Sequence, residues 1–222
     1  MENNIKTIAV VGADGRMGRL VCAKLEKEYN VIKIEKEDSL MGALKADLII
    51  DFASGASSAK TAKFCAEYGI RLVVGATGQT KVEQQQIDNA SKVVPVLQAG
   101  NFSVGIAKLK LALKNVLLDI AEDVVIFEKH HKSKVDSPSG TALEIAGVIE
   151  ERISAKPQIL VERGGKEIGT HQVDIYFGNE VLSVSHQAYS REVFADGAVL
   201  AIKFLLTKSG SGKYNFENAL QR

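Results

Sequence analysis

Apolar residues follow two alternating periods over the first hundred residues of the chain. Short apolar runs rich in β-branched residues alternate with segments whose apolar residues recur at helical spacing. The runs predict strands at Thr7–Val11, Val31–Ile34, Leu48–Asp51, Arg71–Val74 and Val93–Leu97. The helical segments are Arg16–Glu28, Ser57–Tyr68 and Lys81–Ser91. This alternation favours a parallel, doubly wound sheet with right-handed crossovers.

The pattern changes beyond residue 103. It predicts helices over Val104–Leu118, which would link two domains, and over Thr141–Arg152, with strands around Val124–Phe127, Asp174–Phe177 and Val181–His186. A last buried helix is expected over Gly197–Leu206, followed by a tail that packs back on the first domain. We therefore expect an α/β protein with a doubly wound domain at residues 1–103, a smaller α+β domain at 104–191, and a C-terminal helix and tail at 192–222.

Composition narrows the functional class. The 222 residues are 45% hydrophobic and 25% charged, as in ordinary globular proteins, and a net charge of +1 gives no general attraction to nucleic acid. The N-terminus has no leader-like pattern, and no run of about 18 apolar residues suggests a membrane span. We expect a cytoplasmic protein that binds neither nucleic acid nor membrane. Cys22 and Cys65 lie in helical segments without metal-ligand spacing, which indicates structural thiols.

Three glycines, Gly12, Gly15 and Gly18, lie where the first strand gives way to the first helix. Glycine there allows a tight turn, and the helix start offers free N–H groups and a positive dipole end to a pyrophosphate. The GxxGxxG spacing is a variant of GxGxxG, and alone it fits a structural turn equally well. Its place between strand and helix favours a dinucleotide site of Rossmann type.

The second predicted strand ends in an acidic residue. Glu35 follows Gly18 by 17 positions, where a carboxylate accepts hydrogen bonds from ribose hydroxyls. Lys36 beside it allows two interpretations: it offsets the repulsion of a 2′-phosphate by Glu35, or it belongs to a solvated charged run. The cofactor predicted is therefore NADH, NADPH or both.

Two more loops follow predicted strands. They are Phe52-Ala53-Ser54-Gly55 and Gly75-Ala76-Thr77-Gly78. Each alone is typical of a plain turn. Because ligands bind at the carboxyl ends of strands in open α/β sheets, the loops together with the first glycine loop predict one binding edge.

The segment from Glu128 to Thr141 carries two histidines and three lysines. A basic run of this kind is usually a solvated loop. Here it leads into Ser137-Pro138-Ser139-Gly140, a capping residue and proline typical of a helix start. The free N–H groups, the Thr141 hydroxyl and the Lys134 ammonium predict a pocket for a small anionic substrate.

His130 is the candidate general acid of this segment, because imidazole titrates near neutral pH and a bound anion would raise its proton affinity. A metal site is not expected. Adjacent histidines such as His130 and His131 seldom reach one ion, and no cysteine or further histidine follows at ligand spacing.

Five segments in order resemble dihydrodipicolinate reductase: VVGADGRMGRL, GATG, AGNFSVG, EKHHKSKVDSPSGTAL and SHQAYSREVFADGA. They span nearly the whole chain, and the fourth is the most specific. The resemblance implies a reductase of lysine and diaminopimelate biosynthesis, often homotetrameric, that forms tetrahydrodipicolinate from 4-hydroxy-tetrahydrodipicolinate with NADH or NADPH. It also implies that the second domain binds the substrate and mediates oligomerisation.

The resemblance assigns roles by motif position. His130 and Lys134 would be catalytic, and the substrate contacts would be His131, Lys134, Ser139, Gly140 and Thr141. The complete set assigned to the cofactor is Gly12, Gly15, Arg16, Met17, Gly18, Glu35, Lys36, Phe52, Ser54, Gly75, Ala76, Thr77, Ala99, Asn101 and Phe102.

The chain departs from the family pattern in two places. Ser133 stands where many members have a third histidine, and the stretch between Thr170 and Leu182 is short, which predicts a reduced sheet and oligomer interface. Two alternatives remain: a non-catalytic nucleotide-binding sensor, which would not need His130 and Lys134, and another Rossmann dehydrogenase, which would not explain the His-Lys segment.

Overall fold

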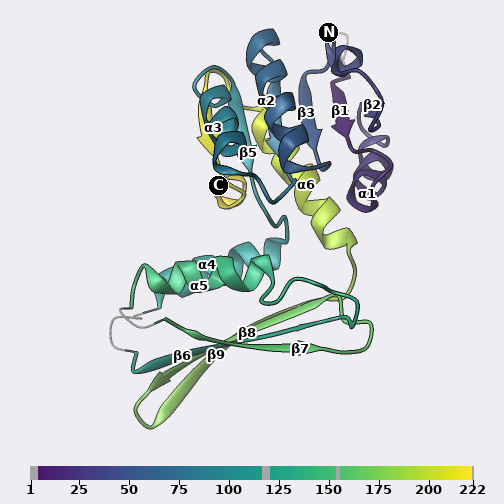
Figure 1. The fold of residues 1–222 in the computed structure, drawn as a ribbon. Coiled ribbons are helices and arrows are strands. Elements are labelled where there is room, and N and C mark those ends of the chain that lie inside the picture. Colours follow the sequence, from purple (N-terminus) through teal and green to yellow (C-terminus); the bar gives the residue numbers. More distant parts are fainter. Residues whose placement is uncertain (1–4, 117–120, 154–155, 222) are drawn as a thin grey trace. The chain divides into compact units, whose positions relative to one another are not determined.

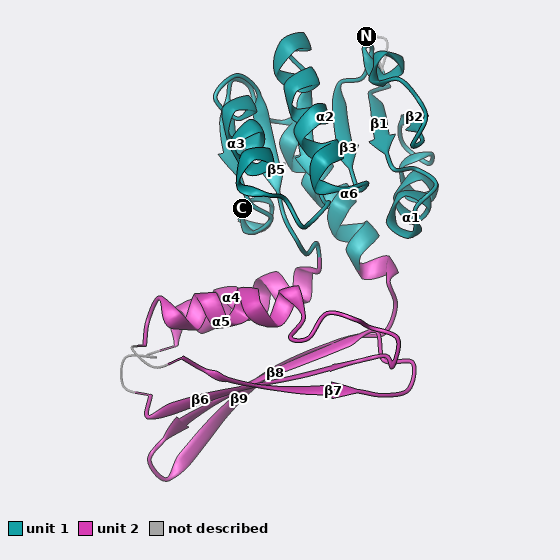
Figure 2. Ribbon diagram, viewed as in Figure 1, with its two compact units in different colours: residues 1–102, 194–222 teal, residues 103–193 magenta. Residues whose placement is uncertain are grey.

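The computed structural model describes residues 5–116, 121–153 and 156–221. The chain divides into two compact units (Figure 2): unit 1 comprises residues 1–102 and 194–222, and unit 2 comprises residues 103–193. In the described part of the chain, no helix has both the length and the apolar character needed to cross a bilayer.

Unit 1 is built on a six-stranded sheet (Figure 1) in which all neighbouring strands are parallel. Its strand order is β10-β5-β4-β3-β1-β2, a doubly wound order whose direction reverses at β1. The strands are β1 (Thr7–Val11), β2 (Asn30–Ile34), β3 (Leu48–Asp51), β4 (Arg71–Val74), β5 (Pro95–Gln98) and β10 (Gly212–Tyr214). The helices are α1 (Arg16–Leu25), α2 (Gly55–Tyr68), α3 (Lys81–Ala90) and α6 (Glu192–Leu206), with short 3-10 helices η1 (Leu40–Ala43) and η3 (Glu217–Leu220).

Helices cover both faces of this sheet, which explains why its central strands are apolar throughout. All four residues of β3 are buried, including Asp51. On one face α2 and α3 enclose a core with alternate strand residues such as Ile49 and Leu72. Ion pairs connect the helices that are not part of this core: Lys24 to Asp196, and Glu28, which follows α1, to Lys203, both at 2.7 Å.

Chain order fixes the binding edge of unit 1. After β1 the chain crosses through α1 to β2 on one side, and then reaches β3 on the other side of β1. This reversal leaves a crevice at the carboxyl ends of β1 and β3, where ligands bind in such sheets. The glycine loop, the Phe52 loop and the Gly75 loop all begin at this edge.

Unit 2 is a four-stranded mixed sheet in the order β7-β6-β8-β9, with two helices over one face. The strands are β6 (Asp123–His130), β7 (Gln158–Arg163), β8 (Gly169–Phe177) and β9 (Glu180–Ala188), and the helices are α4 (Val104–Asn115) and α5 (Gly140–Glu150). The core joins apolar residues of both helices, such as Leu113 and Ile145, to Val124 and Ile126 of β6 and Val173 of β8.

The predicted fold class is confirmed, and β10 in the tail pairs with β5 of unit 1. The end predicted for the first helix of unit 2, Leu118, lies outside the described residues. The helix expected to begin at Gly197 begins at Glu192 instead. Gly197 lies within α6, close to the backbone of Phe102. A Cβ at this position would lie 1.7 Å from the carbonyl oxygen of Phe102, so only glycine fits.

Strand lengths in unit 2 were predicted poorly. The strand expected at Val124–Phe127 continues to His130, and β7 was missed, as was β10 of unit 1. β7 is an edge strand whose side chains are all at least partly exposed, so it lacks the buried apolar run that the prediction relied on. The extension of β6 matters for function, because it places Glu128 and His130 on a strand rather than in a loop.

Candidate active site

The glycine loop of unit 1 has the geometry that a close phosphate approach needs. Gly12 has a φ of +76°, and its N–H donates to the carbonyl oxygen of Ile34 at 2.9 Å. A Cβ at Gly18 would lie 2.0 Å from the Gly12 carbonyl oxygen, so only glycine lets α1 start this close to the turn.

The start of α1 is suited to an anion. Gly15 is its N-cap and provides no side-chain oxygen, and no acidic residue occupies the first turn. Arg16 is exposed and Met17 half-buried just beyond this end. The N-terminal dipole and backbone N–H groups therefore favour a phosphate there.

The neighbouring loops bring several predicted cofactor residues together. The ring of Phe52 fills the space over Gly75, where a Cβ would come within 2.2 Å of it, and lies edge-on to Phe102 with centroids 5.8 Å apart. The N–H groups of Gly75 and Ala76 both donate to the carbonyl oxygen of Asp51, at 2.8 and 3.1 Å. These residues form one aromatic and glycine-lined part of the edge.

Asp51 holds this edge in place, although no sequence pattern indicates that role. Its carboxylate is fully buried and accepts hydrogen bonds from the Ala53 N–H and from the hydroxyls of Ser57 and Thr61, at 2.8, 3.1 and 2.7 Å. Burial raises the pKa of Asp51, and these hydrogen bonds oppose the shift. Ser54, predicted to contact the cofactor, caps α2 through its side chain.

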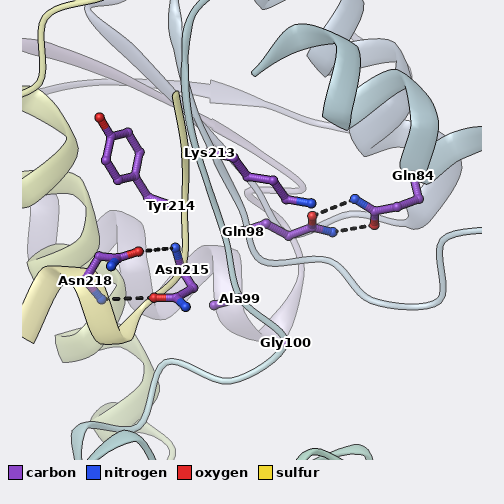
Figure 3. A pocket seen from close by; sticks show the side chains of 8 residues that line it. All are labelled: Gln84, Gln98, Ala99, Gly100, Lys213, Tyr214, Asn215 and Asn218. Carbon is purple, nitrogen blue, oxygen red and sulfur yellow. Dashed lines mark hydrogen bonds between the residues drawn. The ribbon is translucent and has the colours of Figure 1, made fainter. Parts of the chain in front are cut away.

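The remaining cofactor candidates lie at other places along the edge. Thr77 is exposed after β4, and Asn101 is half-buried after β5. Ala99 lines a hollow of about 500 Å³ at the end of β5 (Figure 3). Two reciprocal pairs border this hollow. The side-chain amides of Gln84 and Gln98 donate to each other, and the side-chain oxygens of Asn215 and Asn218 each accept the other residue's backbone N–H.

Glu35 and Lys36 are both exposed at the end of β2. Glu35 lines a hollow of about 310 Å³ together with Ala13 and Asp14 of the glycine loop. The structure therefore brings the acidic residue and the loop to one depression, as a bound adenosine would need.

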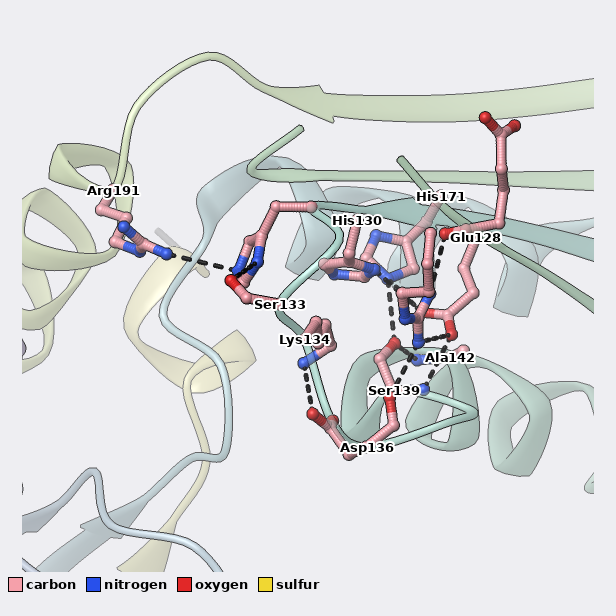
Figure 4. Close-up of polar contacts among 12 residues, drawn as sticks. Glu128, His130, Ser133, Lys134, Asp136, Ser139, Ala142, His171 and Arg191 are labelled. Atoms are coloured by element: carbon pink, nitrogen blue, oxygen red, sulfur yellow. Dashed lines mark hydrogen bonds and ion pairs between the residues drawn. The ribbon is translucent and has the colours of Figure 1, made fainter. Parts of the chain in front are cut away.

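In unit 2 the main polar cluster consists of Glu128, His130 and His171 (Figure 4). Glu128 and His130 are two positions apart on β6 and therefore share the face that the helices cover. Strand β8 places His171 directly opposite Glu128. The Nδ1 of His130 lies 3.1 Å from the Oε2 of Glu128, and the Nε2 of His171 lies 3.8 Å from the same oxygen. All three residues are at least 93% buried, with exposed fractions of 2%, 7% and 3%.

Burial controls the ionisation of this cluster. It lowers the pKa of His171 to about 4 and also lowers the pKa of His130, so both rings are neutral at pH 7. Burial alone would raise the pKa of Glu128, but hydrogen bonds from Ser139 and Arg163 outweigh it and hold that pKa below its usual range. Glu128 is therefore ionised beside two neutral imidazoles.

Arg163 and Ser139 organise the cluster. The Nη2 of Arg163 donates to the Oε1 of Glu128 and to the carbonyl oxygen of Asp136, both at 2.8 Å. The Ser139 N–H donates to the same Oε1 at 2.9 Å, and its hydroxyl caps α5 by accepting the Ala142 N–H. Strand β6, strand β7 and the start of α5 thus meet at one carboxylate.

Lys134 lies beside this cluster in the loop before α5. Its Nζ pairs with the Oδ1 of Asp136 at 2.9 Å (Figure 4), and the Gly140 N–H also stabilises that carboxylate. In this structure the carboxylate of Asp136 therefore binds the Lys134 ammonium and the Gly140 N–H. These are the groups that were predicted to hold a substrate carboxylate. Thr141 lies half-buried in the first turn of α5.

His131 lies apart from the buried cluster. Its Nδ1 lies 2.9 Å from the hydroxyl of Ser133, and its Nε2 lies 3.4 Å from the Nη2 of Arg191. The expectation that no further histidine stands near His130 is wrong in three dimensions, because β8 brings His171 to His130 with ring centroids 5.1 Å apart.

Sequence reasoning missed His171, Arg163 and Asp136. Glu128 and His171 lie far apart along the chain, and the antiparallel register of β6 and β8 places them opposite each other. Asp136 stood within the singled-out segment, and its spacing of two from Lys134 was an available signal for the ion pair.

Comparison with known families covers both units. Residues 6–102 match the family described as dihydrodipicolinate reductase, N-terminus, and residues 106–220 match dihydrodipicolinate reductase, C-terminus. A protein of Bdellovibrio bacteriovorus named 4-hydroxy-tetrahydrodipicolinate reductase is 35% identical, with 96% of this chain and 95% of the relative covered. A protein of the same name from Clostridium tetani is 32% identical, with 95% of each chain covered.

A solved structure has the same fold. The dipicolinate-bound dihydrodipicolinate reductase from Paenisporosarcina sp. TG-14 superimposes with a TM-score of 0.81, covering 96% of this chain and 99% of that one. Sequence identity to it is 22%, so this likeness concerns the arrangement of elements.

Proposed function

The chain belongs to the dihydrodipicolinate reductase family, and from that premise we propose that it reduces 4-hydroxy-tetrahydrodipicolinate to tetrahydrodipicolinate, with release of water, in lysine and diaminopimelate biosynthesis. The observation that carries this proposal is the buried His130 beside Lys134 and the start of α5, a combination of proton donor, cation and helix N-terminus suited to a dicarboxylate. Such a biosynthetic enzyme would work in the cytoplasm.

Unit 1 would hold the cofactor. The start of α1 and the glycine loop suit its pyrophosphate, Glu35 suits its adenosine ribose, and the Phe52, Gly75 and Phe102 group offers an apolar surface to its nicotinamide. A bound NADH or NADPH supplies the hydride. Exposed Lys36 beside Glu35 supports use of both nucleotides.

Unit 2 would bind the substrate. One carboxylate would displace Asp136 from Lys134 and from the Gly140 N–H, and His131 with the first turn of α5 would contact the rest of the molecule. A charge-assisted hydrogen bond of this kind contributes about 1.5–3 kcal/mol. The substrate's negative charge would also raise the proton affinity of His130 when it is needed.

The chemistry assigned to the chain is proton delivery and charge stabilisation. The hydroxyl would leave as water together with a proton of the adjacent ring carbon, which forms a carbon–carbon double bond. The hydride would then add to the carbon that carried the hydroxyl, and the π-electron pair of that bond would move to the adjacent carbon. His130 would give its proton to that enamine-like carbon, and Lys134 would stabilise the charge that develops. One hydride and one proton add to the ring, the nucleotide is oxidised, and His130 regains its proton from solvent.

We also propose a homo-oligomer, a tetramer by the family resemblance. The face of the unit 2 sheet opposite its helices carries Phe127, Leu160, Tyr176 and Val181, which are 37–52% exposed. An exposed apolar group of this size on a sheet face suits self-association. Light scattering coupled to gel filtration measures the assembly, and a monomer at assay concentration would contradict it.

The reductase proposal is tested by a coupled assay in which a synthase generates the substrate. We expect oxidation of NADH or NADPH that requires the synthase product. A non-catalytic sensor would bind nucleotide without oxidising it. Another dehydrogenase would also leave this substrate untouched, and either result would reject the proposal.

A further inference from the structure

The cluster of Glu128, His130 and His171 has the composition of a transition-metal site. Each residue offers one ligand atom, and these three atoms all lie within 4.8 Å of one another. Donors at about 2.0–2.2 Å from a tetrahedral zinc ion lie about 3.3–3.6 Å apart. The separations of 3.1 and 3.8 Å from the Oε2 of Glu128 bracket that range.

Several atoms of the cluster lack a partner. Within the part of the chain that the structure describes, neither the Oε2 of Glu128 nor the Nδ1 of His130 has a hydrogen-bond partner, although they face each other at 3.1 Å. The Nε2 of His171 has one long contact, 3.4 Å from the Ser139 hydroxyl. An ionised carboxylate oxygen left bare at this depth is costly, so its position calls for a cation or a bound water.

The other oxygen of Glu128 is already committed. Arg163 and the Ser139 N–H both bond to Oε1, which orients the carboxylate and leaves Oε2 directed at the two histidines. Support of this kind is what positions ligating carboxylates in metal sites.

We propose that Glu128, His130 and His171 bind one divalent transition-metal ion of the zinc type through Oε2, Nδ1 and Nε2, with a fourth position open to water or a substrate oxygen. Two nitrogen ligands and one carboxylate with an open position are a donor set that zinc and cobalt accept. The cationic Arg163 and Lys134 nearby weaken the site, which favours reversible binding over a permanently held ion.

Binding has a consequence that rests on the proposed function. A metal on Nδ1 of His130 prevents that ring from becoming an imidazolium, the form that would deliver the proton. The ion should therefore inhibit the reductase reversibly, and removal by a chelator should restore activity. Free zinc would regulate the enzyme through its own proton donor.

The test uses the full chain, stripped with EDTA, dialysed and titrated with Co²⁺. Cobalt in a site of low coordination number with nitrogen ligands gives intense visible d–d bands, whereas aqueous Co²⁺ gives weak ones. We expect bands that saturate at one ion per chain and that Zn²⁺ bleaches. Substrate is left out, because a ring nitrogen between two carboxylates itself chelates such ions.

Variants locate the ion. Glu128→Gln keeps the side-chain shape and removes the charge, and we expect it to lower Co²⁺ affinity at least tenfold. His171→Ala should abolish the bands. His186→Gln is the matched control, since His186 lies opposite His171 on β9 and outside the cluster, and it should keep them. Circular dichroism checks that each variant is folded.

Absence of the bands in the wild-type chain, or bands unchanged in both Glu128→Gln and His171→Ala, would overturn the site in favour of a bound water. The assay then separates this proposal from the reductase. An ion that binds to a chain without reductase activity rejects only the function, and an active enzyme that binds no ion rejects only the site.

Discussion

The two units build their candidate sites from different materials. Unit 1 uses the backbone: glycines whose missing side chains leave room, a helix start without acidic residues, and one buried carboxylate that holds a loop. Unit 2 uses titratable side chains. All four histidines of the chain lie there, and two of them are buried beside an ionised Glu128.

The two kinds of site are sensitive to different changes. A backbone site tolerates changes of pH and fails when atoms are added. A side-chain cluster tolerates little change of charge, because its groups are held in particular protonation states by burial. Added side-chain volume should therefore perturb unit 1 more strongly, and a change of charge should perturb unit 2 more strongly.

The largest effect is expected from volume in unit 1. Gly18→Ala places a Cβ 2.0 Å from the Gly12 carbonyl oxygen, so the glycine loop must shift. We expect a loss of about 3 kcal/mol or more in the free energy of unfolding and at least a hundredfold loss of NADH affinity. Urea denaturation and fluorescence titration measure the two quantities.

Gly147→Ala is the control for the same change of residue type. Gly147 lies in α5 of unit 2 with nothing within 4 Å of an added Cβ. Alanine there should stabilise the protein by about 0.5–1 kcal/mol. If the two variants moved stability in the same direction, the view of unit 1 as a site defined by space would be wrong.

The next largest effect comes from charge in unit 2. Lys134→Ala removes the cation proposed to hold a substrate carboxylate, so kcat should fall and KM should rise. A loss of about 1.5–3 kcal/mol corresponds to roughly 10- to 150-fold in kcat/KM. Lys132→Ala makes the same charge change at an exposed neighbour and should stay near wild type. Equal effects in both variants would show that only the overall charge of the loop matters.

Lowering the pH should destabilise unit 2 and not unit 1. The pKa of His171 is lowered from 6.5 to about 4. Its contribution to the free energy of unfolding is therefore fully present above pH 6.5 and is lost as pH falls toward 4. Between pH 7 and pH 5 this amounts to about 2 kcal/mol, because the unfolded state takes up the proton. The pKa of Asp51 in unit 1 is raised, so its contribution moves the other way as pH falls.

Hydrogen exchange in the presence of EDTA reports each unit separately. After correction for intrinsic exchange, protection in β6 and β8 should fall between pH 7 and pH 5, and protection in β3 and β4 should not follow it. His171→Gln should remove most of the difference. A parallel fall in both units of the wild-type chain would contradict the assignment of acid sensitivity to unit 2.

The smallest effect concerns the choice of cofactor. Exposed Glu35 suits free ribose hydroxyls and Lys36 tolerates a phosphate, so we expect NADH to bind at least as well as NADPH. Lys36→Ala should weaken NADPH and leave NADH nearly unchanged. Fluorescence titration of both nucleotides checks this, and a preference for NADPH above about a hundredfold, near 2.7 kcal/mol, would refute it.

Unit 1 could be predicted well from the sequence because its site follows chain order. Every strand of a parallel doubly wound sheet ends at the same edge, so the residues after β1, β3 and β4 had to lie together. What escaped prediction was Asp51, whose hydrogen bonds reach the helix that follows, and Gly197, whose close approach to Phe102 depends on tertiary packing.

Unit 2 could be predicted only in part. The helix start at Ser139 and the location of His130 before it followed from local signals, and the role of His130 stays a prediction. His171 and Arg163 reach Glu128 from other strands, and their register depends on contacts that no local pattern carries. A cluster built from several strands becomes visible only in the folded chain.

The proposed division of roles gives His130 the delivery of a proton at a site in unit 2 and gives unit 1 the binding of the nucleotide. Steady-state kinetics and NADH binding of purified His130→Ala, compared with wild type, test it most directly. We predict a fall in kcat of about 10²- to 10⁴-fold with a smaller change in KM and unchanged NADH affinity. A variant that keeps more than about a tenth of wild-type kcat, with less than 1.4 kcal/mol of barrier at stake, would contradict the account.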